Sequence, residues 1–294
     1  MKLLNDLSKY GRACILVLFL AISLLSLSSC KPATAMQKAP YVVLSPEIAE
    51  ILASLGALDE ISGVTAECDF PQQLTEKTIV GNFGAIDKEK VISLEPSIVF
   101  TTALEQDAIA ADLRKLGIKV VSSYPKGLDK MLSEITRLGE IIGKEAEAKA
   151  LVDSLKNEIL EIGKAAENVE KKPKIYLEIY RDPLMSVSDE SLVGELINHS
   201  GGVNSFKVLE RDYSRINPEE VIKAMPDIMI CYSRDSLENI LSRKGWNVIP
   251  AIKNKQIYFE EDISPDLIQR ASPRSIQGMK ELAKIYQKWR EADL

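Results

Sequence analysis

Residue types that could carry out catalysis are scarce in this 294-residue sequence. His199 is its only histidine, so a Ser/His/Asp triad would depend on that residue alone. It lies in a helix that the pattern predicts over residues 191–200, where a solvated or helix-capping histidine is the simpler interpretation. The many carboxylates cannot be paired for general acid–base work from sequence alone. These observations favour a binding protein over an enzyme, with an exported hydrolase as the alternative from another class.

The glycine and histidine patterns also argue against nucleotide and metal sites. Gly81 and Gly84 lack the spacing of a Walker or dinucleotide motif, and Gly201–Gly202 follows an expected helix where both motifs require a strand. Carriers of bare zinc or manganese ions coordinate the metal with several histidines and carboxylates, which one histidine cannot supply. We therefore expect no catalytic residue, no cofactor and no bound metal.

Composition and charge exclude further classes. Apolar residues make up 46% of the chain and charged residues 27%, as in ordinary globular proteins. The formal net charge is −6. Proteins that bind nucleic acids carry a basic excess because counterion release supplies most of their affinity. We therefore expect no nucleic-acid partner.

Residues 1–29 predict an export signal. Basic residues precede an uncharged apolar run over residues 13–27, which is followed by two serines and Cys30. This arrangement matches a lipoprotein processing site, at which the cysteine thiol receives the lipid. A transmembrane anchor is the alternative, but about 15 apolar residues fall short of the ~20 that span a bilayer. We expect an extracytoplasmic protein, anchored to the membrane through lipid on Cys30 and a tether over residues 30–39.

Two cysteines, Cys68 and Cys231, remain in the body of the protein. They show no spacing typical of a metal site. We interpret them as buried free thiols, although an oxidising compartment would also permit a disulfide.

Short apolar runs alternate with helical patterns from residue 40 onward, which is typical of parallel α/β units. Strands are expected over residues 41–44, 61–64, 98–101 and 118–122, and helices over 46–55 and 105–116. These elements complete a first α/β lobe over residues 40–126. Residues 127–172 lack strand signals and proline and predict one or two long helices. A strand over 174–180 then opens a second α/β lobe, residues 173–294.

An internal repeat supports this division. Residues 89–98 and 219–228 share Glu, Val, Ile, Pro and Ile at identical spacing. Each segment predicts a short helix that leads through a proline into a buried strand. Because the segments occupy matching points of the two lobes, we infer a duplication. Two similar lobes would face each other across a cleft, which is a preferred place for a ligand.

Residues 80–96, 201–204 and 245–258, together with Cys30, carry a family resemblance. Their order and spacing resemble the periplasmic-type binding proteins of importers for vitamin B12, ferric siderophores and haem. The resemblance implies two α/β lobes, each a small, mostly parallel sheet with flanking helices, joined by one long rigid helix. It also implies a ligand cleft between the lobes and delivery of the ligand to an ABC importer permease dimer with a cytoplasmic ATPase.

The same resemblance gives a role to the repeated Glu89 and Glu219. Members of this family present one surface carboxylate per lobe to arginine pockets on the two permease subunits. Acids in the first turn of a helix also favour the helix dipole, which is the alternative interpretation. Because these two recur at one position in both lobes, we interpret them as docking residues.

Residues 270–274 and 278–283 resemble the vitamin B12 branch of the family more than its siderophore branch. The resemblance implies that Phe83 and Tyr213 stack on a flat corrin, and that Asp266 and Arg270 lie near its amides. Phe70 and Tyr180 are further candidate walls. At a third position where the family has an aromatic residue, this sequence departs from the pattern and has Thr102. We predict a corrinoid ligand such as cobalamin.

A ferric siderophore or haem is the alternative ligand. A neutral, amide-rimmed macrocycle needs apolar faces and dipolar partners, whereas an anionic chelate or a haem carboxylate needs cationic partners. Four arginines could serve such an anion: Arg181, Arg211, Arg215 and Arg270.

Overall fold

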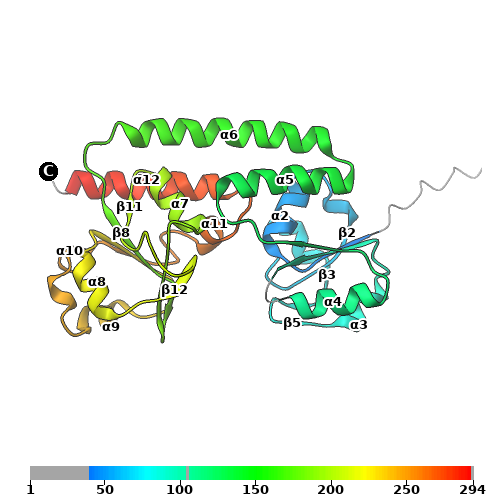
Figure 1. Ribbon diagram of the computed structural model, residues 1–294, viewed down its shortest axis with the longest axis horizontal. Coiled ribbons are helices and arrows are strands. Elements are labelled where there is room, and N and C mark those ends of the chain that lie inside the picture. Colours follow the sequence, from blue (N-terminus) through cyan, green and yellow to red (C-terminus); the bar gives the residue numbers. More distant parts are fainter. Residues whose placement is uncertain (1–39, 104–105, 293–294) are drawn as a thin grey trace, which may run out of the picture. The chain divides into compact units, whose positions relative to one another are not determined.

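The computed structural model describes residues 40–103 and 106–292. The predicted signal (1–29), the tether (30–39) and Cys30 lie outside these residues. None of the helices in the described part of the chain is both long and apolar enough to cross a membrane. From Pro40 onward the chain forms one compact unit (Figure 1).

The first lobe is built on a five-stranded sheet in which every pairing is parallel. Its strands lie in the order β3-β2-β1-β6-β7, with β1 (Tyr41–Val43), β2 (Ile61–Val64), β3 (Thr78–Ile79), β6 (Ile98–Thr102) and β7 (Val120–Ser123). The helical elements are α2 (Pro46–Ser54), η1 (Leu58–Glu60), η2 (Gln72–Glu76), α3 (Lys88–Ser93) and α4 (Asp107–Lys115). The strands and helices predicted for this lobe are confirmed to within two residues at each end.

Helix α2 shows why the local sequence was enough to predict the position of a helix. Ser45 caps it, since its hydroxyl accepts the backbone N–H of Ile48 at 3.4 Å. Pro46 occupies the first turn, where its missing N–H is not needed. Ile48 and Leu52 are fully buried in the core. Gly56 follows the helix with φ +74°, a left-handed conformation that glycine adopts freely.

A short antiparallel hairpin, β4 (Gly81–Asn82) with β5 (Ala85–Ile86), was not predicted. A side chain at Gly81 would place its Cβ 2.3 Å from the carbonyl oxygen of Ala85, so only glycine fits there. Phe83 lies at the tip of this hairpin.

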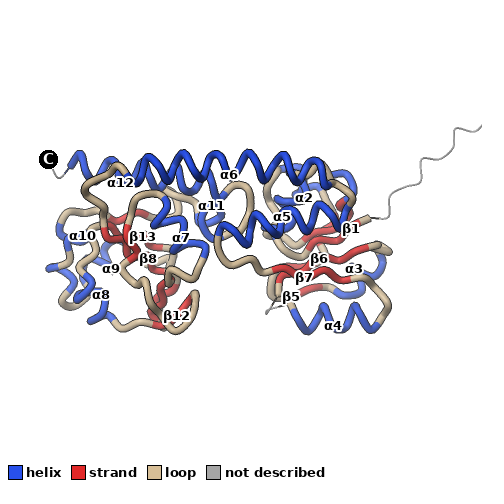
Figure 2. The backbone as a smooth tube through the Cα atoms, turned by 45° about the horizontal axis from the view of Figure 1, so that its top comes forward, coloured by secondary structure: helices blue, strands red, loops and turns tan. Residues whose placement is uncertain are grey.

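The predicted helical stretch contains two helices, α5 (Leu128–Ile142) and α6 (Glu145–Glu167). The chain breaks between them at Gly143, which has φ +70°. Figures 1 and 2 show α6 running past helices of both lobes, and it contacts α5, α7 and α12. This is the long helix that joins the lobes.

The second lobe repeats the parallel sheet and adds a small antiparallel one. The parallel sheet has the order β11-β8-β13-β14, with β8 (Lys174–Glu178), β11 (Val203–Asn204), β13 (Ile228–Cys231) and β14 (Ile257–Tyr258). The antiparallel sheet, which was not predicted, has the order β12-β10-β9, with β9 (Tyr180–Arg181), β10 (Leu184–Val187) and β12 (Tyr213–Arg215). The helical elements are α7 (Leu192–His199), α8 (Pro218–Ala224), α9 (Leu237–Ser242), η3 (Trp246–Val248), α10 (Pro250–Lys253), α11 (Pro265–Gln269) and α12 (Ser275–Ala292).

The predicted internal repeat has the same structure in both lobes. Helix α3 leads into β6 as α8 leads into β13, and both strands lie next to the first strand of their lobe. Val91 and Val221, at equivalent positions, are fully buried. Glu95 and Met225, just before the two prolines, share an unusual positive φ of 47° and 48°. The two similar α/β lobes predicted from the sequence are thus present.

The division of the chain into a first lobe (40–126), a helical segment (127–172) and a second lobe (173–294) stays a prediction. The first sheet ends at Ser123 and the second begins at Lys174. One buried apolar cluster nevertheless includes side chains from both lobes and from α5, α6 and α12, among them Phe100, Leu132, Leu155, Ile230 and Leu282.

Candidate ligand-binding site

Three adjoining hollows extend from one lobe to the other. The first-lobe hollow, of about 590 Å³, is lined by Ser122, Ser123, Tyr124, Pro125, Lys126, Lys130, Ser133, Glu134 and Arg137. The junction cavity, of about 50 Å³, is lined by Glu47, Tyr124, Pro125, Lys126, Ser191, Leu192, Asp212, Tyr213, Gln269 and Ala271. The second-lobe hollow, of about 400 Å³, is lined by Met185, Leu209, Glu210, Arg211, Tyr213, Ser214 and Arg215. Residues 124–126 are common to the first two hollows and Tyr213 to the last two.

Asp212 joins the lobes at the junction cavity. Its carboxylate accepts a hydrogen bond from the Tyr124 hydroxyl at 3.2 Å and lies 3.1 Å from the Lys126 ammonium. Although partial burial opposes it, contact with Lys126 and Tyr124 lowers the pKa of Asp212. Burial, together with the charge of Asp212, raises the pKa of Tyr213 to about 12. Tyr213 therefore presents a neutral phenol ring to the hollows.

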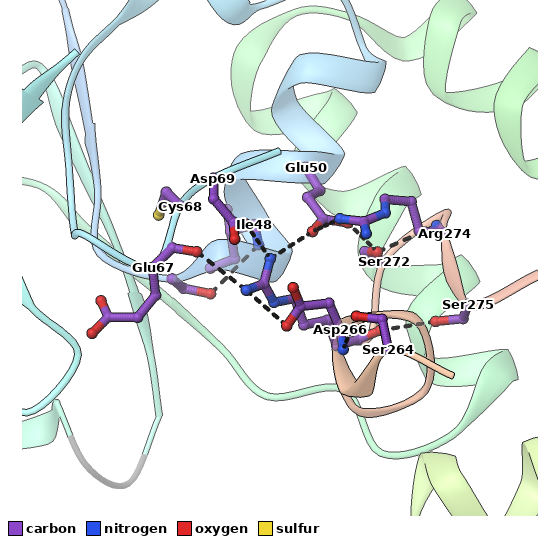
Figure 3. A network of polar contacts seen from close by, with 12 residues as sticks. Ile48, Glu50, Glu67, Cys68, Asp69, Ser264, Asp266, Ser272, Arg274 and Ser275 are labelled. Carbon is purple, nitrogen blue, oxygen red and sulfur yellow. Dashed lines mark hydrogen bonds and ion pairs between the residues drawn. The ribbon is translucent and has the colours of Figure 1, made fainter. Parts of the chain in front are cut away.

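A second contact between the lobes centres on Arg270, whose partners Glu50, Asp69 and Asp266 are labelled in Figure 3. Its guanidinium lies 3.0 Å from the Glu50 carboxylate, 2.8 Å from Asp69 and 2.9 Å from Asp266. It also donates to the backbone carbonyl of Glu67 at 3.2 Å. Three carboxylates thus surround one cation, and Arg270 is only 14% exposed.

Glu50 is the most buried member of this network, at 2% exposure. Its other partners are the Ser272 hydroxyl and the Arg274 guanidinium, the latter at 3.0 Å. Burial raises the pKa of Glu50, against the hydrogen bonds and charges of Ser272, Arg274 and Arg270. The sequence analysis missed Glu50, although a charged residue among the apolar positions of α2 was an available signal.

Two residues of this network, Arg274 and Glu67, also contact predicted aromatic residues of the site. The Arg274 guanidinium lies over the Phe70 ring, 4.1 Å from its centroid. The Glu67 carboxylate accepts the backbone N–H of Phe83 at 3.0 Å. Phe70 is 46% exposed and Phe83 is half-buried.

The six predicted ligand contacts therefore fall into two groups. Tyr213 lines the hollows, and Tyr180, 55% exposed, pairs across strands with Met185 of the second-lobe hollow. The remaining four belong to or adjoin the Arg270 network: Phe70, Phe83, Asp266 and Arg270. The sequence analysis missed Tyr124, Lys126 and Asp212, which have no sequence pattern that would pair them. Thr102 is buried at 2% exposure.

The two predicted docking residues occupy equivalent exposed positions. Glu89 and Glu219 lie in the first turns of α3 and α8. Other side chains cap these helices: Asp87 accepts the N–H of Lys90, and Glu220 accepts the N–H of Asn217. The carboxylates of Glu89 and Glu219 are thus not required as caps.

A buried ionic cluster at the end of β8 engages Arg181, one of the four arginines considered for an anionic ligand. Arg243 binds Glu178 through both terminal nitrogens and lies 2.7 Å from Asp235. Arg181 lies 3.3 Å from the same Asp235 carboxylate. Arg211 and Arg215 are exposed and line the second-lobe hollow.

The remaining candidates have structural explanations. His199 is exposed at the end of α7, in a separate hollow of about 620 Å³ among α5, α6 and α7. Cys68 and Cys231 are buried free thiols, as the sequence interpretation favoured. Over residues 40–103 and 106–292, no cluster of His, Cys, Asp and Glu could hold a metal ion.

Comparison with known proteins gives the family. The sequence profile of the periplasmic binding proteins matches residues 42–262. The chain belongs to this family. It is 28% identical over 249 residues to YvrC of Bacillus subtilis, an uncharacterized ABC transporter substrate-binding lipoprotein, covering 82% of this chain and 78% of that one. It is 23% identical to a vitamin B12-binding protein of Vibrio parahaemolyticus, covering 84% and 88%.

Solved structures support the same fold for this periplasmic binding protein. The haem-binding protein RhuT of Roseiflexus sp. RS-1, in its apo form, superposes with a TM-score of 0.76 at 20% identity, covering 85% of this chain and 98% of that one. The family resemblance and the two-lobed α/β fold inferred from the sequence are confirmed.

Proposed function

We propose that this protein captures a corrinoid between its two lobes and delivers it to the permease of an ABC importer. The observation that carries the proposal is the row of three hollows across both lobes, with Tyr213 lining two of them. Apolar faces exposed to such a row suit a flat macrocycle. Tyr213 is the proposed aromatic wall within the row, and Phe83, Phe70 and Tyr180, which do not line the three hollows, are the other proposed aromatic walls.

The charge around Arg270 favours a neutral ligand edge at this position. Asp266, with its side chain 31% exposed, and Arg270 are the proposed polar contacts. Because Glu50, Asp69 and Asp266 already neutralise Arg270, an incoming free carboxylate would meet like charge there. An amide, which both donates and accepts, would meet complementary groups instead.

Haem or a ferric siderophore is the second candidate ligand. It is favoured by Arg211 and Arg215, which are exposed and line the second-lobe hollow. Relatives named for vitamin B12 and relatives named for haem resemble this chain to a similar degree. Absorption spectra of the purified protein after incubation with cobalamin, haem or a ferric siderophore distinguish these ligands, because each is coloured differently. Retention of the corrin spectrum is the expected result, and retention of haem or a ferric chelate alone would contradict the proposal.

Delivery of the ligand to a permease gives proposed roles to three further residues, Glu89, Glu219 and Cys30. Glu89 and Glu219 are the proposed contacts with the permease dimer, whose cytoplasmic ATPase drives import. Lipid on Cys30 would anchor the protein outside the cytoplasm. No catalytic role is proposed, and turnover of a small substrate would favour the exported hydrolase instead.

A further inference from the structure

The first-lobe hollow is rich in cationic side chains. Lys126, Lys130 and Arg137 line it, with Glu134 as its single carboxylate. Arg137 donates to both oxygens of Glu134, so these two charges cancel. Lys126 lies 3.1 Å from Asp212 of the second lobe. Lys130 is exposed, and no carboxylate of the described residues lies within ion-pair distance of it.

Ser123 provides a second, independent observation. This residue lines the same hollow and is 5% exposed, and its hydroxyl has no hydrogen-bond partner in the structure described. A buried hydroxyl without a partner is destabilising, and a ligand that accepts its hydrogen bond would remove that cost. An oxyanion would accept its hydrogen bond and pair with Lys130.

The position of the hollow connects it to the proposed ligand. Residues 124–126 line both this hollow and the junction cavity, which Tyr213 also lines, so a ligand that contacts Tyr213 and extends past residues 124–126 would reach the first-lobe hollow. Cobalamin carries its corrin and, on a nucleotide tail, one anionic phosphodiester.

We propose that the first-lobe hollow binds the phosphodiester of the corrinoid's nucleotide tail through Lys130 and Ser123. The proposal rests on the proposed function and deepens it, since it selects complete corrinoids over those without the tail. The corrin amides would lie toward Arg270, and the phosphodiester toward Lys130 in the first-lobe hollow.

The test compares cyanocobalamin with dicyanocobinamide, which has the corrin but lacks the phosphodiester and its base. Calorimetry on the full chain is done with Lys130→Gln, Ser123→Ala and the control Lys149→Gln, which removes an equally cationic, 77% exposed side chain on α6. Each test variant should weaken cyanocobalamin binding by about fivefold to tenfold, as expected for a charge-assisted hydrogen bond at a partly open site. Cobinamide binding should not change, and the control should alter neither ligand.

The melting temperature of Ser123→Ala distinguishes a role of Ser123 in ligand binding from a role in stabilising the fold. Removing an unsatisfied buried hydroxyl should leave the melting temperature unchanged or higher, while cobalamin affinity falls. Equal effects on both corrinoids, or no effect on either, would overturn the phosphodiester site and leave the corrinoid proposal standing. Failure of both corrinoids to bind the unaltered protein would overturn the two proposals together.

Discussion

Arg270, which directly follows α11, contacts Glu50 on α2; its Nη1 lies 3.0 Å from the Glu50 Oε1, although the two residues are 220 positions apart in the sequence. This contact connects the second lobe to the first at a carboxylate that is 2% exposed. The guanidinium also contacts Glu67 and Asp69, on the segment that leads to Phe70. Arg270 therefore connects the two lobes and also contacts the segment that carries Phe70, a proposed wall of the site.

Replacing Arg270 should destabilise the fold. Arg270→Met keeps the length of the side chain but leaves the buried Glu50 with one cation fewer, which costs about 3 kcal/mol when one partner of a buried pair is removed. The control Lys149→Met breaks the exposed Lys149–Asp153 pair and should change stability by less than about 0.5 kcal/mol. Urea unfolding measures both, and equal effects would show that the network contributes no more than a surface pair.

The cost of Arg270→Met should increase with pH. Burial already raises the pKa of Glu50 in the folded protein above its ordinary value of 4.5, and loss of the Arg270 charge would raise it further. A carboxyl with a raised folded pKa contributes stability below its unfolded pKa and loses it as pH rises through the folded value. The two proteins should therefore differ least near pH 4 and most near pH 7. A difference that shrinks over this range would contradict the assignment.

Truncation of a proposed aromatic wall should weaken ligand binding without unfolding the protein. Tyr213→Ala or Phe83→Ala should each reduce cobalamin affinity by about 1–3 kcal/mol, because a large apolar face is lost from a desolvated site. Leu116→Ala, at a position that is 59% exposed and away from the hollows, is the control. Unchanged calorimetric affinity in both aromatic variants would remove these residues from the site.

The docking glutamates should matter for transport and not for capture. Glu89→Ala combined with Glu219→Ala should leave cobalamin affinity unchanged and abolish uptake, because two weak contacts act together through their effective concentration. Uptake into proteoliposomes with the cognate permease, measured at low and high salt, tests this. Glu76→Ala with Glu140→Ala, a pair of exposed acids on η2 and α5, serves as the control. Normal uptake by the Glu89/Glu219 variant would make both residues ordinary acids of helix first turns.

Anchoring depends on the thiol of Cys30. Cys30→Ser should give an unprocessed or released protein without covalent lipid, because a serine hydroxyl cannot form the thioether. Fractionation and intact mass measure the outcome, and equal membrane retention with equal mass would contradict the lipoprotein assignment.

The sequence predicted those parts of the fold that local signals determine. Strand β2 occupies the predicted residues, and α2 begins after its predicted cap, Ser45. The short antiparallel sheet that carries Tyr180 and Tyr213 was missed because strands of two to four residues have too few positions to show a period. The pairing of Lys126 with Asp212 depends on how the lobes meet, which no local pattern encodes.

The central claim, a corrinoid held between the lobes, is tested most directly by calorimetric titration of one preparation of the full chain with cyanocobalamin, haem and a ferric catecholate in turn. The account predicts saturable binding of cyanocobalamin with one site per chain, tighter than either other ligand, and a loss of affinity in Tyr213→Ala. Tight binding of haem or the ferric catecholate with no heat from cyanocobalamin would contradict it.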